Sequence, residues 1–193
     1  METKQMIRRC FGLVRGVGLS GLLLVLTACG GAQVQVNTDP QLRKGPEASQ
    51  PMAKAAAESF EKALALLGEH DRAKDWNTST CTAVAKAFDE AASLQKSETG
   101  KEFPEAIYNA GIALQRCKMH KEALEKFQAA LAADEKFHRA RTQLALYRYR
   151  EKGRAEIDGV IAELQRAIAD AQYQNVEALV NLAMLQMERR SQT

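Results

Sequence analysis

The stretch that decides the fold runs from residue 104 to residue 134 and reads PEAIYNAGIALQRCKMHKEALEKFQAALAAD. Pro104 suits the first position of a helix, and the short break Lys118–His120 separates two helical apolar patterns. Gly111 is costly inside a helix, so another segment must approach closely there. The pattern predicts two antiparallel helices that meet through small residues.

Counted from Pro104 as position 1, this stretch resembles the tetratricopeptide repeat (TPR), a 34-residue helix–turn–helix unit. Glu135 stands in place of the usual closing proline. The residues that match repeat positions 8, 11, 20, 24 and 27, without gaps, are Gly111, Leu114, Ala123, Phe127 and Ala130.

The pattern recurs along the chain. Gln143 lies 34 residues after Asn109, and Asn181 lies 38 residues after Gln143. The extra residues fit the polar stretch Arg150–Glu156, where an insertion costs little. We expect a third repeat to begin near Val176 and to supply one helix. Residues 104–193 are therefore predicted to hold TPR repeats, the last one incomplete.

Upstream, Phe60, Leu64 and Leu67 lie at helical spacing, and Val84, Phe88 and Ala91 repeat the 20–24–27 spacing. We interpret residues 52–103 as a degenerate TPR-like helix pair with a long turn around Gly68–Thr80. The predicted fold is an all-α TPR helix–turn–helix solenoid behind a lipoprotein signal peptide and a flexible tether.

The N-terminal segment has the architecture of a signal peptide: a basic start, the apolar run Gly16–Val25 and small residues before Cys29. The apolar run is too short to span a bilayer. Leu26–Cys29 resembles the lipobox of bacterial lipoproteins, which implies cleavage after residue 28 and lipid, including palmitate, on Cys29. The alternative is an ordinary signal peptide with a chance cysteine. Residues 29–51 hold few large apolar side chains and are predicted to be a disordered tether.

Two features bear on export and destination. Arg8 and Arg9 resemble the core of a twin-arginine signal, which leaves that route and the general secretory route both open. Gly30 follows the lipobox cysteine where retained inner-membrane lipoproteins of some bacteria carry Asp, which favours the outer membrane. We expect a lipid-anchored protein of the cell envelope that faces the periplasm.

The charge excludes nucleic acid as a partner. The chain carries 27 basic and 24 acidic residues, but residues 1–28 hold four basic residues against one acidic residue. The remaining chain is therefore formally neutral, with 23 of each sign. Nucleic-acid binding needs a basic footprint on the folded domain.

Cysteine usage predicts one disulfide. Cys10 belongs to the signal segment and Cys29 to the lipobox, which leaves Cys81 and Cys117 in an oxidising compartment. In TPR stacking, the second helix of one pair lies beside the first helix of the next. Cys81 starts one such helix and Cys117 ends the other, so we expect them to be neighbours. Two buried free thiols are the alternative.

No motif points to catalysis, a cofactor or a metal. The three histidines, His70, His120 and His138, have no metal-ligand spacing. No nucleophile elbow, P-loop or dinucleotide fingerprint occurs. Trp76 is expected to cover the core of the first helix pair or to serve as an exposed contact. We expect a protein that is not an enzyme.

The TPR resemblance also implies a partner-binding groove, because positions 2, 5, 9 and 12 of the first helix of each repeat tend to face the concave side. The groove is predicted to be apolar and suited to a helix or an extended peptide. The alternative is that some of these side chains pack between repeats. The residues carried over are Tyr108, Ile112, Gln115, Thr142, Leu146, Tyr149, Glu177, Val180, Met184 and Met187.

These features predict a protein–protein interaction scaffold that binds envelope proteins through the groove and outer-membrane lipid through Cys29. The runs Tyr108–Gly111, Phe137–Arg141 and Asn175–Ala183, with Arg116-Cys117, resemble the TPR lipoproteins of the gliding-motility envelope complex. The alternative is a pilotin-type lipoprotein that assembles a pilus or a secretin. An enzyme on a helical scaffold is the rival class.

The last predicted helix, from Val176 onward, is apolar on nearly every side, although terminal repeats need a polar outer face. A helix of this kind is normally buried all round. Three explanations are open: self-association, a partner that supplies an additional helix, or a longer repeat array of which this chain is a fragment.

Overall fold

The computed structural model describes residues 52–191, which form helices and short connections with no strand among them. The helices belong to one compact unit, Pro46–Thr193. The predicted signal peptide, Cys29 and the predicted tether lie outside the described residues. The elements are α1 (Lys54–Ala73), α2 (Thr78–Thr99), α3 (Pro104–Arg116), α4 (His120–Ala133), α5 (His138–Lys152), the 3₁₀ helix η2 (Gly153–Glu156), α6 (Ile157–Asp170) and α7 (Val176–Arg190).

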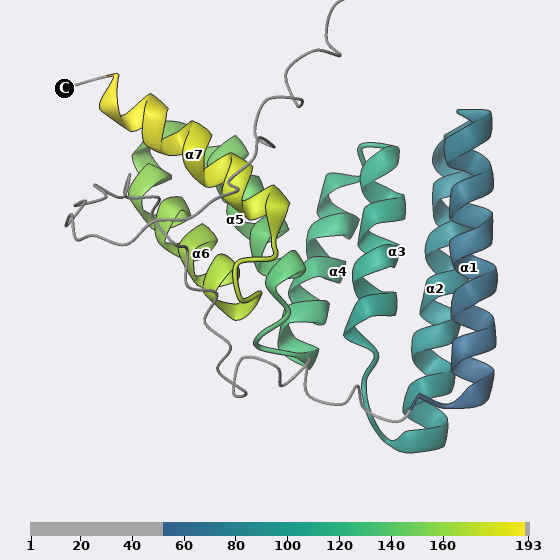
Figure 1. The fold of residues 1–193 in the computed structure, drawn as a ribbon. Coiled ribbons are helices and arrows are strands. Elements are labelled where there is room, and N and C mark those ends of the chain that lie inside the picture. Colours follow the sequence, from purple (N-terminus) through teal and green to yellow (C-terminus); the bar gives the residue numbers. More distant parts are fainter. Residues whose placement is uncertain (1–51, 192–193) are drawn as a thin grey trace, which may run out of the picture. The chain divides into compact units, whose positions relative to one another are not determined.

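Each helix packs chiefly against the helices that precede and follow it in the sequence. Figure 1 shows this arrangement as a succession of antiparallel helices from α1 to α7. Helices α1 and α2, α3 and α4, and α5 and α6 form three pairs, and α7 follows the third. The architecture is the all-α repeat solenoid predicted from the sequence.

The contact between α3 and α4 has the predicted small-residue geometry. A Cβ atom on Gly111 would lie 2.7 Å from Cε1 of Phe127 and 3.1 Å from Cβ of Lys126. Ala110 and Ala113 of α3, like Ala123 of α4, are fully buried. The absence of a side chain at residue 111 lets the Phe127 ring lie directly against the α3 backbone.

The predicted long turn in the first pair is wrong. Helix α1 continues through Gly68 to Ala73, and only Lys74–Asn77 connects it to α2. The helix persists because Leu66 and Leu67 pack against the apolar core. Lys74 then ends α1 in the left-handed conformation, with φ of 56°.

Helix α2 begins with a capping box at Asn77. The Asn77 side chain accepts hydrogen bonds from the backbone N–H groups of Ser79 and Thr80, and the Thr80 hydroxyl accepts one from the Asn77 N–H. Trp76, just before this cap, is half-buried against the core. This position agrees with the first of the two roles predicted for Trp76, that of covering the core of the first helix pair.

The third pair, α5 and α6, accommodates the inserted residues at its turn. Helix α5 extends to Lys152, and η2 leads into α6. Val160, Leu164 and Ile168 of α6 form an apolar cluster with Ala178 and Leu185 of α7. This cluster attaches one face of α7 to the solenoid.

Buried polar side chains join α5 to its neighbours. Arg141 is almost fully buried, and it pairs with Glu163 and with Asp170 of α6, at 3.2 and 3.4 Å. Asn175, which caps α7, donates a hydrogen bond to the Thr142 hydroxyl at 2.9 Å. Because buried polar groups cost free energy unless they are paired, these contacts specify how α5, α6 and α7 lie against one another.

Candidate functional site

A row of polar side chains crosses the first helices of three successive repeats. The Gln115 amide of α3 donates a hydrogen bond to Oε1 of Gln143 on α5, at 3.1 Å. The Gln143 amide in turn donates to Oε1 of Glu177 on α7, at 2.8 Å. We call Gln115, Gln143 and Glu177 the polar row. It ties α3 to α5 and α5 to α7, and its middle member, Gln143, is buried, with 5% of the residue exposed.

The prediction that Tyr108 faces the groove is wrong, because its side chain is buried, with 6% of the residue exposed. Its ring packs 5.5 Å from the Phe127 ring and 5.5 Å from the Phe137 ring. The Arg139 guanidinium lies over it at 5.2 Å. Burial, reinforced by the negative charge of Glu177, raises the Tyr108 pKa to about 12. The phenol therefore stays neutral and serves as part of the core.

The remaining groove residues of α3 and α5, apart from Thr142, are half-buried. Ile112 packs against the core cluster of the first two pairs, so it belongs partly to the interior. Leu146 lies one helical turn from Gln143 on α5 and belongs to no core cluster. The surface predicted to be apolar is therefore mixed here, because the half-exposed Gln115 amide and Leu146 both contribute to it. Thr142 is fully buried, so the prediction that it faces the groove is wrong.

Tyr149 ties α5 to α7. Its hydroxyl donates a hydrogen bond to Oε2 of Glu188 at 2.6 Å, and Nε of Arg154 donates to the other carboxylate oxygen at 2.8 Å. The hydrogen bond to Glu188 raises the Tyr149 pKa, and the hydrogen bonds from Tyr149 and Arg154 lower the Glu188 pKa. The Tyr149 hydroxyl therefore forms its hydrogen bond within the chain and is less available to a partner.

Three of the four predicted groove residues of α7 are apolar and widely exposed. Val180 is 53% exposed, Met184 57% and Met187 65%. Single exposed apolar residues are common, but neighbouring ones on a helix face mark an interaction surface. The contact surface that the structure offers therefore combines Gln115, Leu146 and Glu177 with the exposed apolar residues of α7.

Sequence reasoning missed the polar row as a unit. Its members occupy different repeat positions, and they meet only because of how α3, α5 and α7 are offset from one another. The buried Arg141 was missed as well, since an arginine in a helix normally reads as a surface residue. The one sequence feature that pointed to its burial was its position among the small residues of the second repeat.

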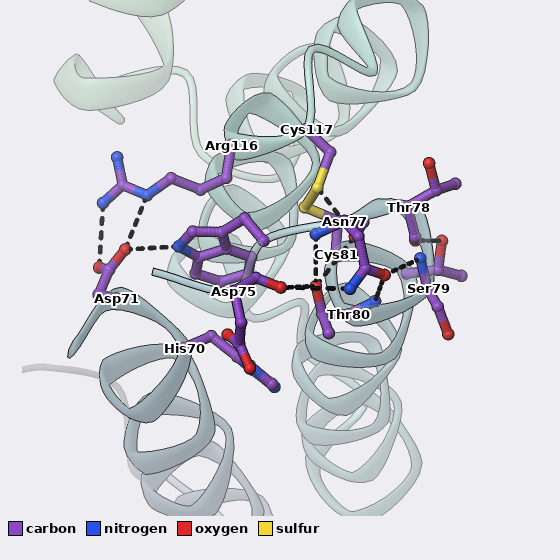
Figure 2. Close-up of a disulfide and its surroundings, with 12 residues drawn as sticks. His70, Asp71, Asp75, Asn77, Thr78, Ser79, Thr80, Cys81, Arg116 and Cys117 are labelled. Carbon is purple, nitrogen blue, oxygen red and sulfur yellow. Dashed lines mark hydrogen bonds and ion pairs between the residues drawn. A yellow bond between two sulfur atoms is a disulfide. The ribbon is translucent and has the colours of Figure 1, made fainter. Parts of the chain in front are cut away.

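The predicted cysteine pair is joined in the structure. A disulfide links Cys81, in the first turn of α2, to Cys117, which caps the end of α3, with the Cα atoms 6.3 Å apart. Figure 2 shows a second connection beside the disulfide, an ion pair between Arg116 and Asp71. The Arg116 guanidinium donates two hydrogen bonds, each 3.1 Å, to the Asp71 carboxylate, which also accepts from the Trp76 indole at 3.0 Å. These contacts fasten α1 and α2 to α3.

The histidines occupy separate environments. His70 contacts Asp75 at 2.8 Å, His120 lies 3.3 Å from the Tyr147 hydroxyl, and His138 contacts the Asn175 amide at 3.1 Å. Within residues 52–191, no three His, Cys, Asp or Glu side chains are grouped so that they could hold a metal ion. Over the same stretch, no helix has both the length and the apolar character needed to cross a membrane.

The comparisons with known proteins agree with the geometry. No protein-family model matches the sequence, and no curated protein matches it. A solved structure that does match is the TPR domain of Sgt2 from Aspergillus fumigatus, with a TM-score of 0.54 and 16% sequence identity. The match covers 76% of this chain and 85% of that one. At this identity the likeness shows the fold alone, and the fold is TPR-like.

Proposed function

We propose that this chain is a lipid-anchored protein–protein interaction scaffold in the bacterial cell envelope, which helps to assemble or localise an outer-membrane or periplasmic machine. The polar row is the observation that carries the proposal. By bonding α3 to α5 and α5 to α7, the row holds the first helices of three repeats side by side, so a partner segment that follows the solenoid can contact Gln115, Leu146 and Glu177 in turn.

The chemistry of this surface fits a polypeptide. The half-exposed Gln115 amide and the exposed Glu177 carboxylate can hydrogen-bond to a polypeptide, whereas the buried Gln143 amide bonds to both of them within the chain. Leu146 on α5 and Met184 on α7 offer apolar contact. A partner with alternating polar and apolar contacts along a helix or an extended segment would match this surface.

The lipobox resemblance supports the anchoring part of the proposal. Several acyl chains on Cys29 would hold the chain at a membrane, where one chain would bind only transiently. The tether of about 22 residues would give the scaffold a typical reach of roughly 25–30 Å from that membrane. The likeness of Tyr108–Gly111, Phe137–Arg141 and Asn175–Ala183 to gliding-motility lipoproteins favours the gliding complex, with a pilus or secretin assembly as the alternative.

Co-purification from the envelope tests the proposal. The tagged full chain is cross-linked in cells, solubilised in detergent and isolated, and the bound proteins are identified by mass spectrometry. We expect a discrete set of envelope proteins, whose identity separates a gliding complex from a pilus or secretin. Recovery of no envelope protein above an untagged control contradicts the proposal.

A matched pair of variants tests the surface. Leu146→Glu places a charge beside the polar row, whereas Gln128→Glu places the same charge on an exposed site of α4. We expect the first to lower partner recovery several-fold and the second to leave it unchanged. Equal recovery with both variants would show that the partner binds elsewhere.

A further inference from the structure

Helix α7 is joined to α5 through a buried amide whose orientation is fixed at both ends. Asn175, just before α7, is only 5% exposed. Its Oδ1 accepts a hydrogen bond from the backbone N–H of Ala178 at 3.1 Å, so its NH2 group faces α5. There the NH2 group donates to the Thr142 hydroxyl at 2.9 Å and lies 3.1 Å from Nδ1 of His138. The amide thus connects the start of one helix to the start of the other.

The contact with His138 requires a neutral imidazole. An amide NH2 group is a double donor, so both groups that it meets on α5 must accept. The Thr142 hydroxyl oxygen can accept, because its own hydrogen is donated to the His138 carbonyl at 2.9 Å. The His138 ring can accept only through a lone pair on Nδ1, which places the ring proton on Nε2. The junction therefore selects one tautomer of neutral His138.

Proton binding at His138 removes this acceptor. Both ring nitrogens of an imidazolium are donors, so the new Nδ1–H would face the NH2 group of Asn175. Turning the amide over would give His138 an acceptor, but it would set the NH2 group against the Ala178 N–H and abolish the helix cap. Either arrangement leaves a polar group of the junction without its partner, which destabilises the attachment of α7 to α5.

We propose that His138 is a pH-dependent latch: the neutral ring holds the start of α7 against α5, and the protonated ring lets the start of α7 loosen. Helix α7 is suited to respond, because Ala178 and Leu185 are its only buried residues and little apolar packing opposes movement. Gln143 can bond to Glu177 in either state, so the change is a loosening of the first turn and not a loss of the helix.

The surroundings of His138 set the pH at which the latch opens. Burial disfavours the charged ring most strongly, and the positive charge of Arg139 on the same helix adds to this. Asp170 at the end of α6 and Asp134 before α5 act in the opposite direction, but Asp170 already pairs with Arg141 at 3.4 Å. The net effect lowers the pKa of His138 below its ordinary value of about 6.5. The latch is therefore closed above about pH 6.5 and opens progressively as the pH falls below that value.

The consequence for binding rests on the proposed function. Glu177 and Val180 of the partner surface lie in the first two turns of α7. Loosening there would move them relative to Gln115 on α3 and Leu146 on α5, so the surface should bind its partner less tightly in acid. The latch itself is a property of this chain alone and is tested without a partner, so its failure would leave the proposed function standing.

The tautomer of His138 provides the first test, measured on the compact unit of residues 46–193. Long-range proton–nitrogen NMR spectra of the imidazole ring distinguish a proton on Nε2 from a proton on Nδ1. We expect the Nε2–H form at about pH 7.5, and titration of the same signals should give a pKa below about 6.5. A proton on Nδ1 in the folded protein at about pH 7.5 overturns the latch, because the Asn175 amide would then face a donor.

Amide hydrogen exchange tests the movement, through protection factors that correct for the intrinsic effect of pH. The Ala178 and Leu179 amides bond to Asn175, so their protection should fall several-fold, relative to α3, from about pH 7.5 to about pH 5.5. In His138→Gln an amide oxygen that does not titrate replaces Nδ1, and the fall should disappear. The control His120→Gln removes a histidine that contacts Tyr147 instead, and it should retain the fall. No fall in the wild type, or an equal fall in His138→Gln, overturns the latch.

Discussion

Adding a single methyl group at Gly111 should destabilise the fold, although the same change normally stabilises a helix. Gly111 lies in the middle of α3, where alanine would be favoured by about 1 kcal/mol on helix propensity alone. The new Cβ atom, however, would lie 2.7 Å from Cε1 and 3.0 Å from Cδ1 of the Phe127 ring. Carbon atoms at these distances overlap, so α3 and α4 must move apart or the ring must leave its position.

The size of the destabilisation follows from two opposing effects, the gain in helix propensity and the cost of overpacking. Overpacking a close contact costs typically 1–3 kcal/mol, which leaves Gly111→Ala destabilised by about 0–2 kcal/mol and Gly111→Leu by about 1–3 kcal/mol or more. Gly68 provides the matched control, because it also lies inside a helix and its Cβ would meet only the flexible end of Arg72, at 3.4 Å. Gly68→Ala should therefore stabilise by about 0.5–1 kcal/mol.

Urea denaturation of residues 46–193, followed by circular dichroism, measures both changes under identical conditions. For a domain of this size, each kcal/mol corresponds to a melting-temperature shift of about 3–4 °C, so thermal melts give an independent reading. We expect Gly68→Ala to melt above the wild type and Gly111→Leu to melt below it. If Gly111→Leu melts no lower than the wild type, the close contact between α3 and α4 does not exist and the repeat register is wrong.

Three further predictions concern the disulfide, one histidine and the lipid anchor. Replacing Cys81 and Cys117 with Ser should lower the free energy of unfolding by about 4 kcal/mol, since the bond closes a loop with a sequence separation of 36; reductant should destabilise the wild type equally and leave the variant unaffected. Burial and the positive charge of Arg139 lower the His138 pKa. As the pH falls, the unfolded chain therefore binds a proton at His138 before the folded chain does. Stability should therefore fall as the pH drops through about 6.5, and His138→Gln should flatten that slope in denaturation measured from about pH 7.5 to about pH 5.5. Cys29→Ser should leave unprocessed, unlipidated precursor, and normal acyl labelling of that variant would count against the anchor.

The parts of the fold that were predictable from sequence rest on local spacing. Gly111, Ala123 and Phe127 specify the α3–α4 contact, because side-chain size at fixed helical intervals decides how closely two helices approach. The pairing of Cys81 with Cys117 followed from helix order alone, since consecutive helices in a repeat solenoid run antiparallel.

The features that sequence reasoning missed depend on tertiary context. The glycine at residue 68 suggested a break, yet apolar packing of the residues on either side keeps α1 helical there. Tyr108 was placed in the groove by repeat position, but Phe137 and Arg139 of the next repeat cover it. The polar row depends on how far successive repeats are offset from one another. The insertion between α5 and α6 changes that offset, and the spacing of residues in the sequence does not specify its geometry.

The two ends of the solenoid are held by different means, and this difference gives α7 a particular role. A disulfide and a two-bond ion pair fasten α1 and α2 to α3, whereas α7 buries only Ala178 and Leu185 of its own residues. Helix α1 also buries only two residues, Ala56 and Ala63, so the ties to α3 rather than burial distinguish α1 from α7. In a repeat array each unit is stabilised only by its neighbours, so among the described helices α7 should open before α3 and α4. Amide hydrogen exchange should therefore be faster in α7 than in α3 and α4, and equal protection of the three helices would contradict this order.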